Sequence, residues 1–175
     1  MAFPGPSPCS WPIVVMGASG AGKSTVGTAI AQRLHVPYAD GDEFHSRAAI
    51  AKMADGQPLH DEDRQPWLVH IGLWLKAHSN GSVVSCSALK RRYRDTLRSY
   101  APTLYVLHLE IDPDLARERI RARKGHFMPA TLIASQFEDL EPLGPDERGM
   151  TIRVTRAASI EEVVTQFLAR CAAPE

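Results

Sequence analysis

Residues 17–24, Gly-Ala-Ser-Gly-Ala-Gly-Lys-Ser, have the types and the spacing that bind a chain of phosphates. They match G-x-x-x-x-G-K-[ST], in which glycines let backbone N–H groups converge on phosphate oxygens. Lys23 would neutralise the β- and γ-phosphates and the Ser24 hydroxyl would ligate Mg²⁺, whereas a plain glycine-rich turn would leave Lys23 solvated. We expect ATP to bind at Gly17, Ala18, Ser19, Gly20, Ala21, Gly22, Lys23, Ser24 and Thr25.

Two carboxylates, Asp40 and Asp42, follow the next short apolar segment. At alternate positions of an extended segment they would point the same way, into one cleft at the carboxyl edge of a sheet. A small-molecule kinase needs one acid near Mg²⁺ and one that orients the acceptor hydroxyl or accepts its proton. We assign Asp40 to the metal and Asp42 to substrate binding and catalysis. The alternative is a solvated turn rich in Asp and Gly.

The elements that would position these residues alternate between strands and helices. An apolar run precedes the glycine-rich loop, and Val26, Ile30 and Leu34 follow it at helical spacing. Strands are predicted at 13–16, 37–40, 82–86, 103–110 and 150–155, and helices at 43–53, 61–78, 89–99, 113–123 and 160–170, the last begun by a capping box of Ser159 and Glu162. This alternation predicts an α/β fold with a five-stranded parallel sheet flanked by helices.

Two segments fit neither strands nor plain connections. Residues 54–66 combine Gly, Pro and acids, and residues 123–129 are basic with Gly and Pro, so both are expected to be loops that meet ligands. We predict a single kinase domain over 13–172, with a short lid at about 123–131. The proline-rich residues 1–12 are predicted to be a disordered tail.

Composition narrows the class of protein. The chain has 175 residues, 44% of them hydrophobic, which suits one domain. Twenty basic residues balance twenty acidic ones, so no overall field favours nucleic acid or an anionic membrane as a partner. Three widely spaced cysteines argue against a disulfide framework, and no apolar stretch is long enough to cross a bilayer. We expect a cytoplasmic protein.

Several blocks of sequence, in this order, resemble the gluconokinase family of short P-loop kinases. They are residues 16–24, 40–45, 50–53, 56–68, 86–95, 125–129 and 135–142. The phosphate loop is common to a vast superfamily, but P-L-x-D-x-D-R-x-P-W within 56–68 and C-S-A-L-K at 86–90 are much narrower. The resemblance covers about 13–170 and departs from the family at Ser46, where Pro is usual, and at Ala49, where Asn is usual.

The resemblance implies a P-loop kinase fold, related to that of nucleoside monophosphate kinases, and a homodimer. It also implies that ATP and Mg²⁺ are used to phosphorylate D-gluconate to 6-phospho-D-gluconate. If the family's Asn contacts substrate, Ala49 would alter affinity or specificity.

A polyhydroxy acid needs cations for its carboxylate and polar side chains for its hydroxyls. As a ligand of the substrate, Arg94 is a weaker candidate than Lys90. His45 could instead pack locally at the start of a helix. For Arg64 an ion pair with Asp61 or Asp63 competes with substrate. The candidate substrate ligands are Asp42, His45, Arg64, Lys90, His126 and Gln136.

The basic segment before the lid has two interpretations. Mixed charge of this density is usually the solvated face of a helix. Lids of similar small kinases, however, bring an arginine over the transferring phosphoryl group, where it stabilises charge. We choose Arg123 as catalytic and Arg119, behind it, as a nucleotide contact.

Other interpretations remain open at this point. Trp67 and Trp74 recur at helical spacing with apolar residues and are expected in the core or a subunit contact. A GTPase is disfavoured, because Asn80, the only Asn, is followed by Gly81 and cannot form N-K-x-D. The remaining rivals are a kinase for shikimate or a nucleoside monophosphate, and a non-catalytic nucleotide-binding switch.

Overall fold

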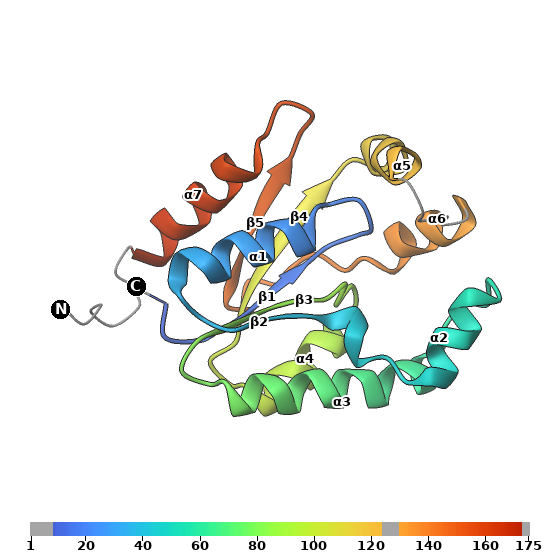
Figure 1. Ribbon diagram of the computed structural model, residues 1–175, viewed down its shortest axis with the longest axis horizontal. Coiled ribbons are helices and arrows are strands. Elements are labelled where there is room, and N and C mark those ends of the chain that lie inside the picture. Colours follow the sequence, from blue (N-terminus) through green and yellow to red (C-terminus); the bar gives the residue numbers. More distant parts are fainter. Residues whose placement is uncertain (1–8, 124–129, 173–175) are drawn as a thin grey trace.

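A parallel sheet of five strands, in the order β2-β3-β1-β4-β5, forms the centre of the fold (Figure 1). The computed structural model describes residues 9–123 and 130–172. The central strand β1 is buried at all five positions, as a parallel strand covered on both faces requires. The predicted sheet is confirmed, with strand ends within two residues of those expected. The strands are β1 (Pro12–Met16), β2 (Tyr38–Asp40), β3 (Ser82–Ser85), β4 (Tyr105–Ile111) and β5 (Gly149–Val154).

Helices cover both faces of the sheet. In Figure 1, α1 and α7 lie on one side and α3 and α4 on the other. The capping box is confirmed, because Ser159 and Glu162 each accept a hydrogen bond from the other's backbone N–H. The helices are α1 (Lys23–Leu34), α2 (Arg47–Ala54), α3 (Asp61–Ala77), α4 (Arg91–Tyr100), α5 (Pro113–Ala122), α6 (Ala130–Asp139) and α7 (Ile160–Ala172).

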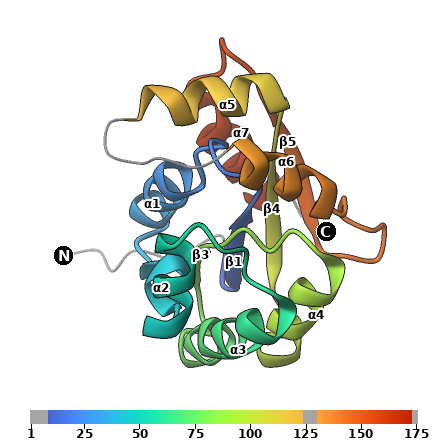
Figure 2. The same cartoon turned by 90° about the vertical axis from the view of Figure 1, so that its right-hand side faces the viewer.

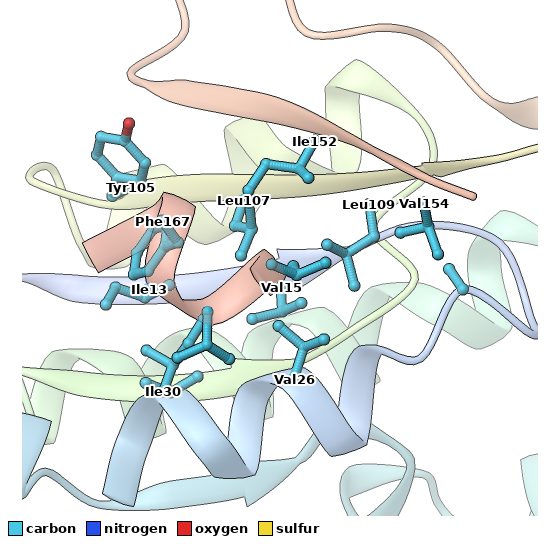
Figure 3. Close-up of a cluster of buried hydrophobic side chains, with 14 of the residues drawn as sticks. Ile13, Val15, Val26, Ile30, Tyr105, Leu107, Leu109, Ile152, Val154 and Phe167 are labelled. Atoms are coloured by element: carbon cyan, nitrogen blue, oxygen red, sulfur yellow. The ribbon is translucent and has the colours of Figure 1, made fainter. Parts of the chain in front are cut away.

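The core has one cluster on each face of the sheet. Ile13 and Val15 of β1 point toward α1 and α7, where Phe167 is fully buried (Figure 3). Val14 and Met16, at the alternate positions, belong to the cluster under α3 and α4. This alternation is the two-residue period of a strand, and it fixes β1 between the two helical layers.

The helix predicted over 43–53 is wrong as a single element. The chain forms a 3-10 turn, η1 (Gly41–Phe44), and then α2. The Asp40 carboxylate accepts the Asp42 N–H at 3.1 Å, which starts the tight turn. His45 is extended, and the Ser46 hydroxyl accepts the Ala49 N–H at 3.1 Å to begin α2. Two local caps therefore split the segment.

One helix was missed, and one expected loop is shorter than predicted. Helix α6 was not predicted. Helix α3 begins at Asp61, where the helix over 61–78 was predicted, and it occupies the second half of the loop expected over 54–66. The α3 start is stabilised by Asp63, whose carboxylate accepts the His60 N–H at 3.0 Å. The ligand-meeting loop is thus shorter than expected.

The tail predicted over 1–12 is too long at its C-terminal end. Residues 1–8 lie outside the described part of the chain, but Cys9 is fully buried and Trp11 stacks on Tyr105 with ring centroids 6.3 Å apart. Pro12 already begins β1. Cys9, Cys86 and Cys171 are all buried free thiols. Within 9–123 and 130–172, no helix combines the length and apolarity needed to cross a membrane.

Three helices lie at the carboxyl edge of the sheet, toward which the strands point. Figure 1 shows α2, α5 and α6 on this side. Figure 2 faces the same edge, with α2 in the lower half of the view and α5 and α6 in the upper half. Strands β1, β2 and β3 end on this side of the sheet, between these helices. In parallel α/β folds, this edge is where ligands bind.

Candidate active site

The loop between β1 and α1 has the geometry of a phosphate cradle. Gly20 has φ 86°, and a Cβ there would lie 2.9 Å from the carbonyl oxygen of Ala116. Only glycine fits such a position without strain. Helix α1 begins at Lys23, and no side chain caps its N-terminus. Its first N–H groups and its dipole therefore suit an anion.

Lys23 lies under this loop. Its Nζ donates to the carbonyl oxygen of Ala18 at 3.2 Å. Burial lowers the pKa of Lys23, and the carboxylates of Asp42 and Asp40 act in the opposite direction. A phosphate anion in the loop would add to the effect of these carboxylates and stabilise the ammonium form.

Ser24 and Asp40 bring a hydroxyl and a carboxylate together beside the loop. The Ser24 Oγ donates to Oδ2 of Asp40 at 2.8 Å. The other Asp40 oxygen accepts the Asp42 N–H. Mg²⁺ prefers such oxygen ligands and keeps several waters and phosphate oxygens in its shell. The pair therefore fits the metal that the sequence predicts here.

Asp42 reaches the site by a different geometry from the one expected. The segment after Asp40 is the turn η1, so the argument from alternating positions of an extended segment is wrong. Both carboxylates nevertheless line the same cavity. Two further bonds hold the turn: the indole Nε1–H of Trp67 donates to the Gly41 carbonyl at 2.6 Å, and the His45 N–H donates to the Asp42 carbonyl at 3.3 Å.

His45 lies flat against Trp67, with ring centroids 4.5 Å apart and an interplanar angle of 8°. Burial lowers the pKa of His45, Asp42 opposes this and Arg64 adds to it. The imidazole is therefore neutral at pH 7, with one nitrogen a donor and the other an acceptor. Its Nδ1 is buried and has no hydrogen-bond partner among the described residues. His45 lines the cavity.

Arg64 projects from the first turns of α3 into the same cavity. Its Nη1 donates to the hydroxyl of Tyr93 at 3.0 Å and lies 3.9 Å from the Asp61 carboxylate. The ion pair with Asp61 is thus long, while Asp63 pairs with Lys52 at 2.7 Å instead. The guanidinium keeps donors for an anionic ligand.

One cavity of about 890 Å³ joins these groups. Gly17, Ala18 and Ala21 of the loop are buried and are not part of its wall. The predicted residues that line it are Ser19, Gly20, Gly22, Lys23, Ser24, Thr25, Asp40, Asp42, His45, Arg64, Arg119, Arg123 and Gln136.

Lys90 is not among the cavity-lining residues. It precedes α4, and its Nζ pairs with the carboxylate of Asp139, at the end of α6, at 3.1 Å. This partner is far away in the sequence and belongs to a helix that was not predicted. The placement of Lys90 does not support the substrate contact expected of it.

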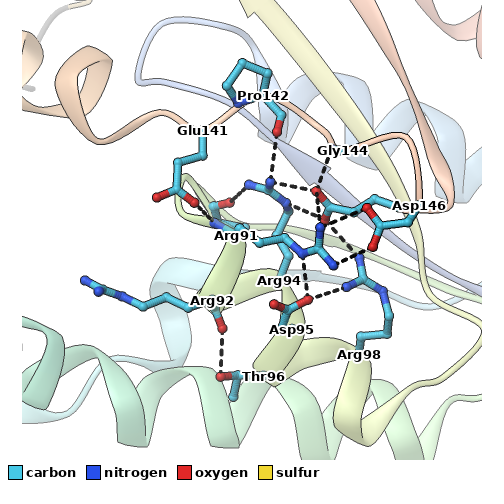
Figure 4. A network of polar contacts seen from close by, with 12 residues as sticks. Arg91, Arg92, Arg94, Asp95, Thr96, Arg98, Glu141, Pro142, Gly144 and Asp146 are labelled. Atoms are coloured by element: carbon cyan, nitrogen blue, oxygen red, sulfur yellow. Dashed lines mark hydrogen bonds and ion pairs between the residues drawn. The ribbon is translucent and has the colours of Figure 1, made fainter.

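Arg94 is a structural residue. It is fully buried and forms two hydrogen bonds with Glu147, at 2.7 and 2.8 Å. It also donates to the carbonyl oxygen of Pro142 at 3.2 Å (Figure 4). Its Nη1 donates to the carbonyls of Ala88 and Leu89, at 3.1 Å each. These residues continue from Ser87, whose carbonyl accepts the N–H of Gly17 at 3.3 Å. Arg94 thus fixes the segment after β3 that lies beside the phosphate loop.

The two arginines predicted before the lid both line the cavity. Arg119 donates to the carbonyls of Gly20 and Thr155, at 3.3 and 3.4 Å. Arg123 is exposed at the end of α5. Arg117 on the same helix pairs with Asp114 at 2.7 Å on the surface, as the solvated-face alternative predicts for it. His126 and the rest of residues 124–129, where the lid is predicted, lie outside the described residues.

Gln136 is placed by α6 against the phosphate loop. Its Oε1 accepts the N–H of Ser19 at 2.7 Å. It was expected to contact substrate, but this bond puts it on the nucleotide side of the cavity. The helical spacing of Ile133, which is buried, and Phe137, which packs on the core, was the sequence signal for α6.

Sequence reasoning missed several cavity-lining residues. Trp67, expected only in the core, is one of them. Cys86 is another, and burial raises the pKa of its thiol to about 12, so it is protonated at neutral pH. A buried tryptophan or cysteine gives no local signal that one edge of it faces a ligand.

Comparisons with known proteins agree with this geometry. A family model described as shikimate kinase matches residues 19–171. The thermoresistant gluconokinase of Escherichia coli K12 is 42% identical over 142 residues, 79% of this chain and 81% of that protein. The gluconokinase of Gluconobacter oxydans 621H is 40% identical over 162 residues, 90% of this chain and 91% of that protein.

A solved structure gives the same result. The crystal structure of a gluconokinase from Sinorhizobium meliloti 1021 is 44% identical and superposes with a TM-score of 0.85, over 93% of this chain and 92% of that one. Such identity over almost the whole length of both chains is more than a shared fold. This chain belongs to the gluconokinase family of P-loop kinases.

Proposed function

We propose that this protein transfers the γ-phosphoryl group of ATP to the terminal hydroxyl of D-gluconate, giving 6-phospho-D-gluconate and ADP. The observation that carries the proposal is one cavity lined at the same time by the phosphate-loop residues Lys23 and Ser24, by the carboxylates Asp40 and Asp42, and by Arg64. Relatives about 40% identical over most of the chain carry the name gluconokinase.

On the nucleotide side, the phosphate loop and Lys23 would bind the phosphates of ATP, and Ser24 and Asp40 would hold Mg²⁺. When bound, Mg²⁺ neutralises phosphate charge and orients the transferring group. Arg123 would add positive charge from the edge of the lid. Gln136 and Arg119 would keep the loop in shape through their bonds to Ser19 and Gly20.

On the acceptor side, Asp42 would orient the acceptor hydroxyl and take its proton as the new O–P bond forms. Arg64 offers a planar guanidinium to the carboxylate of gluconate. His45, neutral and partly buried, offers a ring nitrogen to one of the hydroxyls. His126 remains a predicted ligand in the part of the chain not described, and Lys90 one that its placement does not favour.

The two departures from the family pattern do not touch the cavity wall. Ser46 serves as the N-cap of α2, and Ala49 is 3% exposed beneath it. Neither lines the cavity. We therefore expect gluconate binding to depend on His45 and Arg64 rather than on position 49.

Shikimate is the second candidate acceptor, because the matching family model carries that description. The narrow sequence blocks at 56–68 and 86–90 favour gluconate. A homodimer and a cytoplasmic location follow from the resemblance and the composition, and they stay predictions. Analytical ultracentrifugation tests the first and cell fractionation the second.

The test is ADP release by the purified protein with ATP and Mg²⁺. Acceptors are gluconate, related sugar acids, shikimate and nucleoside monophosphates. Lys23→Ala is the blank, and Lys76→Ala, an exposed lysine on α3, is its matched control. We expect turnover on gluconate that Lys23→Ala abolishes and Lys76→Ala retains. Turnover on shikimate alone would replace the acceptor, and no turnover at all would favour a nucleotide-binding switch.

A further inference from the structure

We propose that Trp67 is a positioning residue for phosphoryl transfer: its indole N–H and its ring fix the turn that carries Asp42 and the imidazole of His45. The proposal rests on the proposed function, in which Asp42 takes the proton of the acceptor hydroxyl. It gives Trp67 a role that packing in the core alone does not require.

The first step is the hydrogen bond from Trp67 to the turn. Its Nε1–H donates to the carbonyl oxygen of Gly41 at 2.6 Å, and the bond is buried. Trp67 itself is only 3% exposed and is held in α3 beside the fully buried Leu68 and Ile71. The donor therefore sits on a rigid element, and the carbonyl it holds belongs to the residue directly before Asp42.

The second step is that the turn cannot move away from the indole. Gly41 is pressed against the end of β3, because a Cβ at this position would lie 2.4 Å from the carbonyl oxygen of Ser85. Asp40, on its other side, is tied to Ser24 and to the N–H of Asp42. The sheet and the indole thus hold Gly41 from two sides, and Asp42 follows in a fixed direction.

The third step concerns the ring of Trp67. It stacks almost parallel on His45, 4.5 Å between centroids and 8° between planes. His45 has a buried Nδ1 with no partner among the described residues, so no hydrogen bond at that atom holds the ring in place. The stack on the indole therefore helps to set the plane of the imidazole. One side chain therefore positions both the proposed base and a proposed substrate ligand.

Trp74 shows what an ordinary tryptophan of this helix does. It lies two turns further along α3. Its ring centroid is 4.4 Å from that of His78 and 6.3 Å from that of Phe44. Those contacts need only an aromatic surface, and Trp74 does not line the cavity. It is a matched control for the loss of an indole N–H from the same helix.

The experiment compares Trp67→Phe with Trp74→Phe. Phenylalanine retains a ring against His45 but cannot donate to Gly41. Small misplacements of reacting groups are costly, so we expect kcat with gluconate to fall about tenfold or more in Trp67→Phe. KM for ATP should stay within about twofold, since the phosphate loop is untouched. Trp74→Phe should keep kcat within about twofold, and thermal unfolding should show that both variants fold.

If Trp67→Phe keeps kcat as Trp74→Phe does, the proposal is wrong. Equal losses in kcat and in ATP affinity would also overturn it, because they would show a general structural defect. If Trp67→Phe fails to fold, an isosteric replacement decides. In a Trp11→Phe/Trp74→Phe chain, Trp67 is the sole tryptophan, and biosynthetic exchange for benzothienylalanine replaces its ring N–H by a sulfur that cannot donate. The same drop in kcat supports the proposal, and an unchanged kcat refutes it.

Failure of the proposed function gives a different result. Wild-type protein without turnover on gluconate would refute the acceptor assignment before any variant is compared. Wild-type turnover together with indistinguishable tryptophan variants would refute only the role of Trp67.

Discussion

The Ser24 hydroxyl donates a hydrogen bond of 2.8 Å to Oδ2 of Asp40, across sixteen residues of sequence. Ser24 lies in the first turn of the helix that follows the phosphate loop, and Asp40 ends the second strand. The bond shows that these two elements place a hydroxyl and a carboxylate side by side, at the point where loop-bound phosphates would end. It defines the predicted metal position more closely than either residue does alone.

Asp40→Asn should weaken the use of Mg²⁺. The amide removes a negative charge and one good oxygen ligand, so the Mg²⁺ concentration for half-maximal ADP release should rise about tenfold or more. Titration of Mg²⁺ at saturating ATP and gluconate measures it. Asp55→Asn, at an exposed carboxylate just after α2, is the control and should leave the curve unchanged. Coincident curves for the two variants would remove Asp40 from the metal site.

Gln136→Glu should weaken nucleotide binding rather than gluconate binding. Glutamate still offers an acceptor to the Ser19 N–H, but it adds a negative charge beside the loop expected to hold phosphates. We expect KM for ATP to rise about tenfold, the cost of about 1.4 kcal/mol, with KM for gluconate changed less than threefold. Gln32→Glu on the exposed side of α1 controls for the charge change. A raised KM for gluconate with an unchanged KM for ATP would instead assign Gln136 to substrate binding.

His45→Phe should weaken gluconate binding. The new ring can still stack on Trp67, but both ring nitrogens are lost from the cavity. One lost hydrogen bond corresponds to roughly three- to tenfold in KM for gluconate. His78→Phe is a close control, because His78 packs on Trp74 in a similar way and does not line the cavity. A KM unchanged in both variants would assign His45 to packing alone.

Glu147→Gln should destabilise the fold. Burial alone would raise the pKa of Glu147, but its bonds to Arg94, Gly144 and Arg98 outweigh it and bring the pKa to about 2. The substitution leaves the buried Arg94 charge without its counter-ion, and we expect a loss of about 3 kcal/mol in urea unfolding at pH 7. Asp146→Asn, at the exposed carboxylate paired with Arg91, should cost less than about 1 kcal/mol.

The Glu147 contribution depends on pH with a definite sign. The folded pKa lies below the ordinary value of 4.5, so the stabilisation is fully present above pH 4.5 and is lost as pH falls toward about 2. The gap in unfolding free energy between wild type and Glu147→Gln should therefore narrow over this window. A gap that stays constant from pH 7 to pH 3 would show that Glu147 does not titrate in this way.

The sequence was informative wherever the signal was local. The run of apolar residues in β1 predicts a buried parallel strand, and the glycine-rich loop with Lys23 predicts a phosphate site, because each needs only neighbouring residues. The same holds for the capping box at Ser159. The sheet and the phosphate loop could therefore both be predicted from the sequence.

The sequence was weakest wherever a role depends on distant partners. Lys90 forms an ion pair with Asp139, and Gln136 accepts a hydrogen bond from Ser19. No pattern among neighbouring residues of the sequence predicts either contact. Trp67 reads as an ordinary apolar position of a helix, since its bond to Gly41 depends on where the sheet ends. The split between η1 and α2 was missed because two short caps overrode a helical pattern.

The ion pair between Arg94 and Glu147 also bears on the order in which the chain becomes functional during synthesis. Its two partners are 53 residues apart, and the second lies just before the last strand. A nascent chain that already contains the phosphate loop and Asp42 still lacks the counter-ion that lets Arg94 hold the Ala88–Leu89 carbonyls. The phosphate loop and Asp42 therefore leave the ribosome early, but the contacts that hold the segment beside the loop are complete only after Glu147 has emerged, with 28 of the 175 residues still to follow.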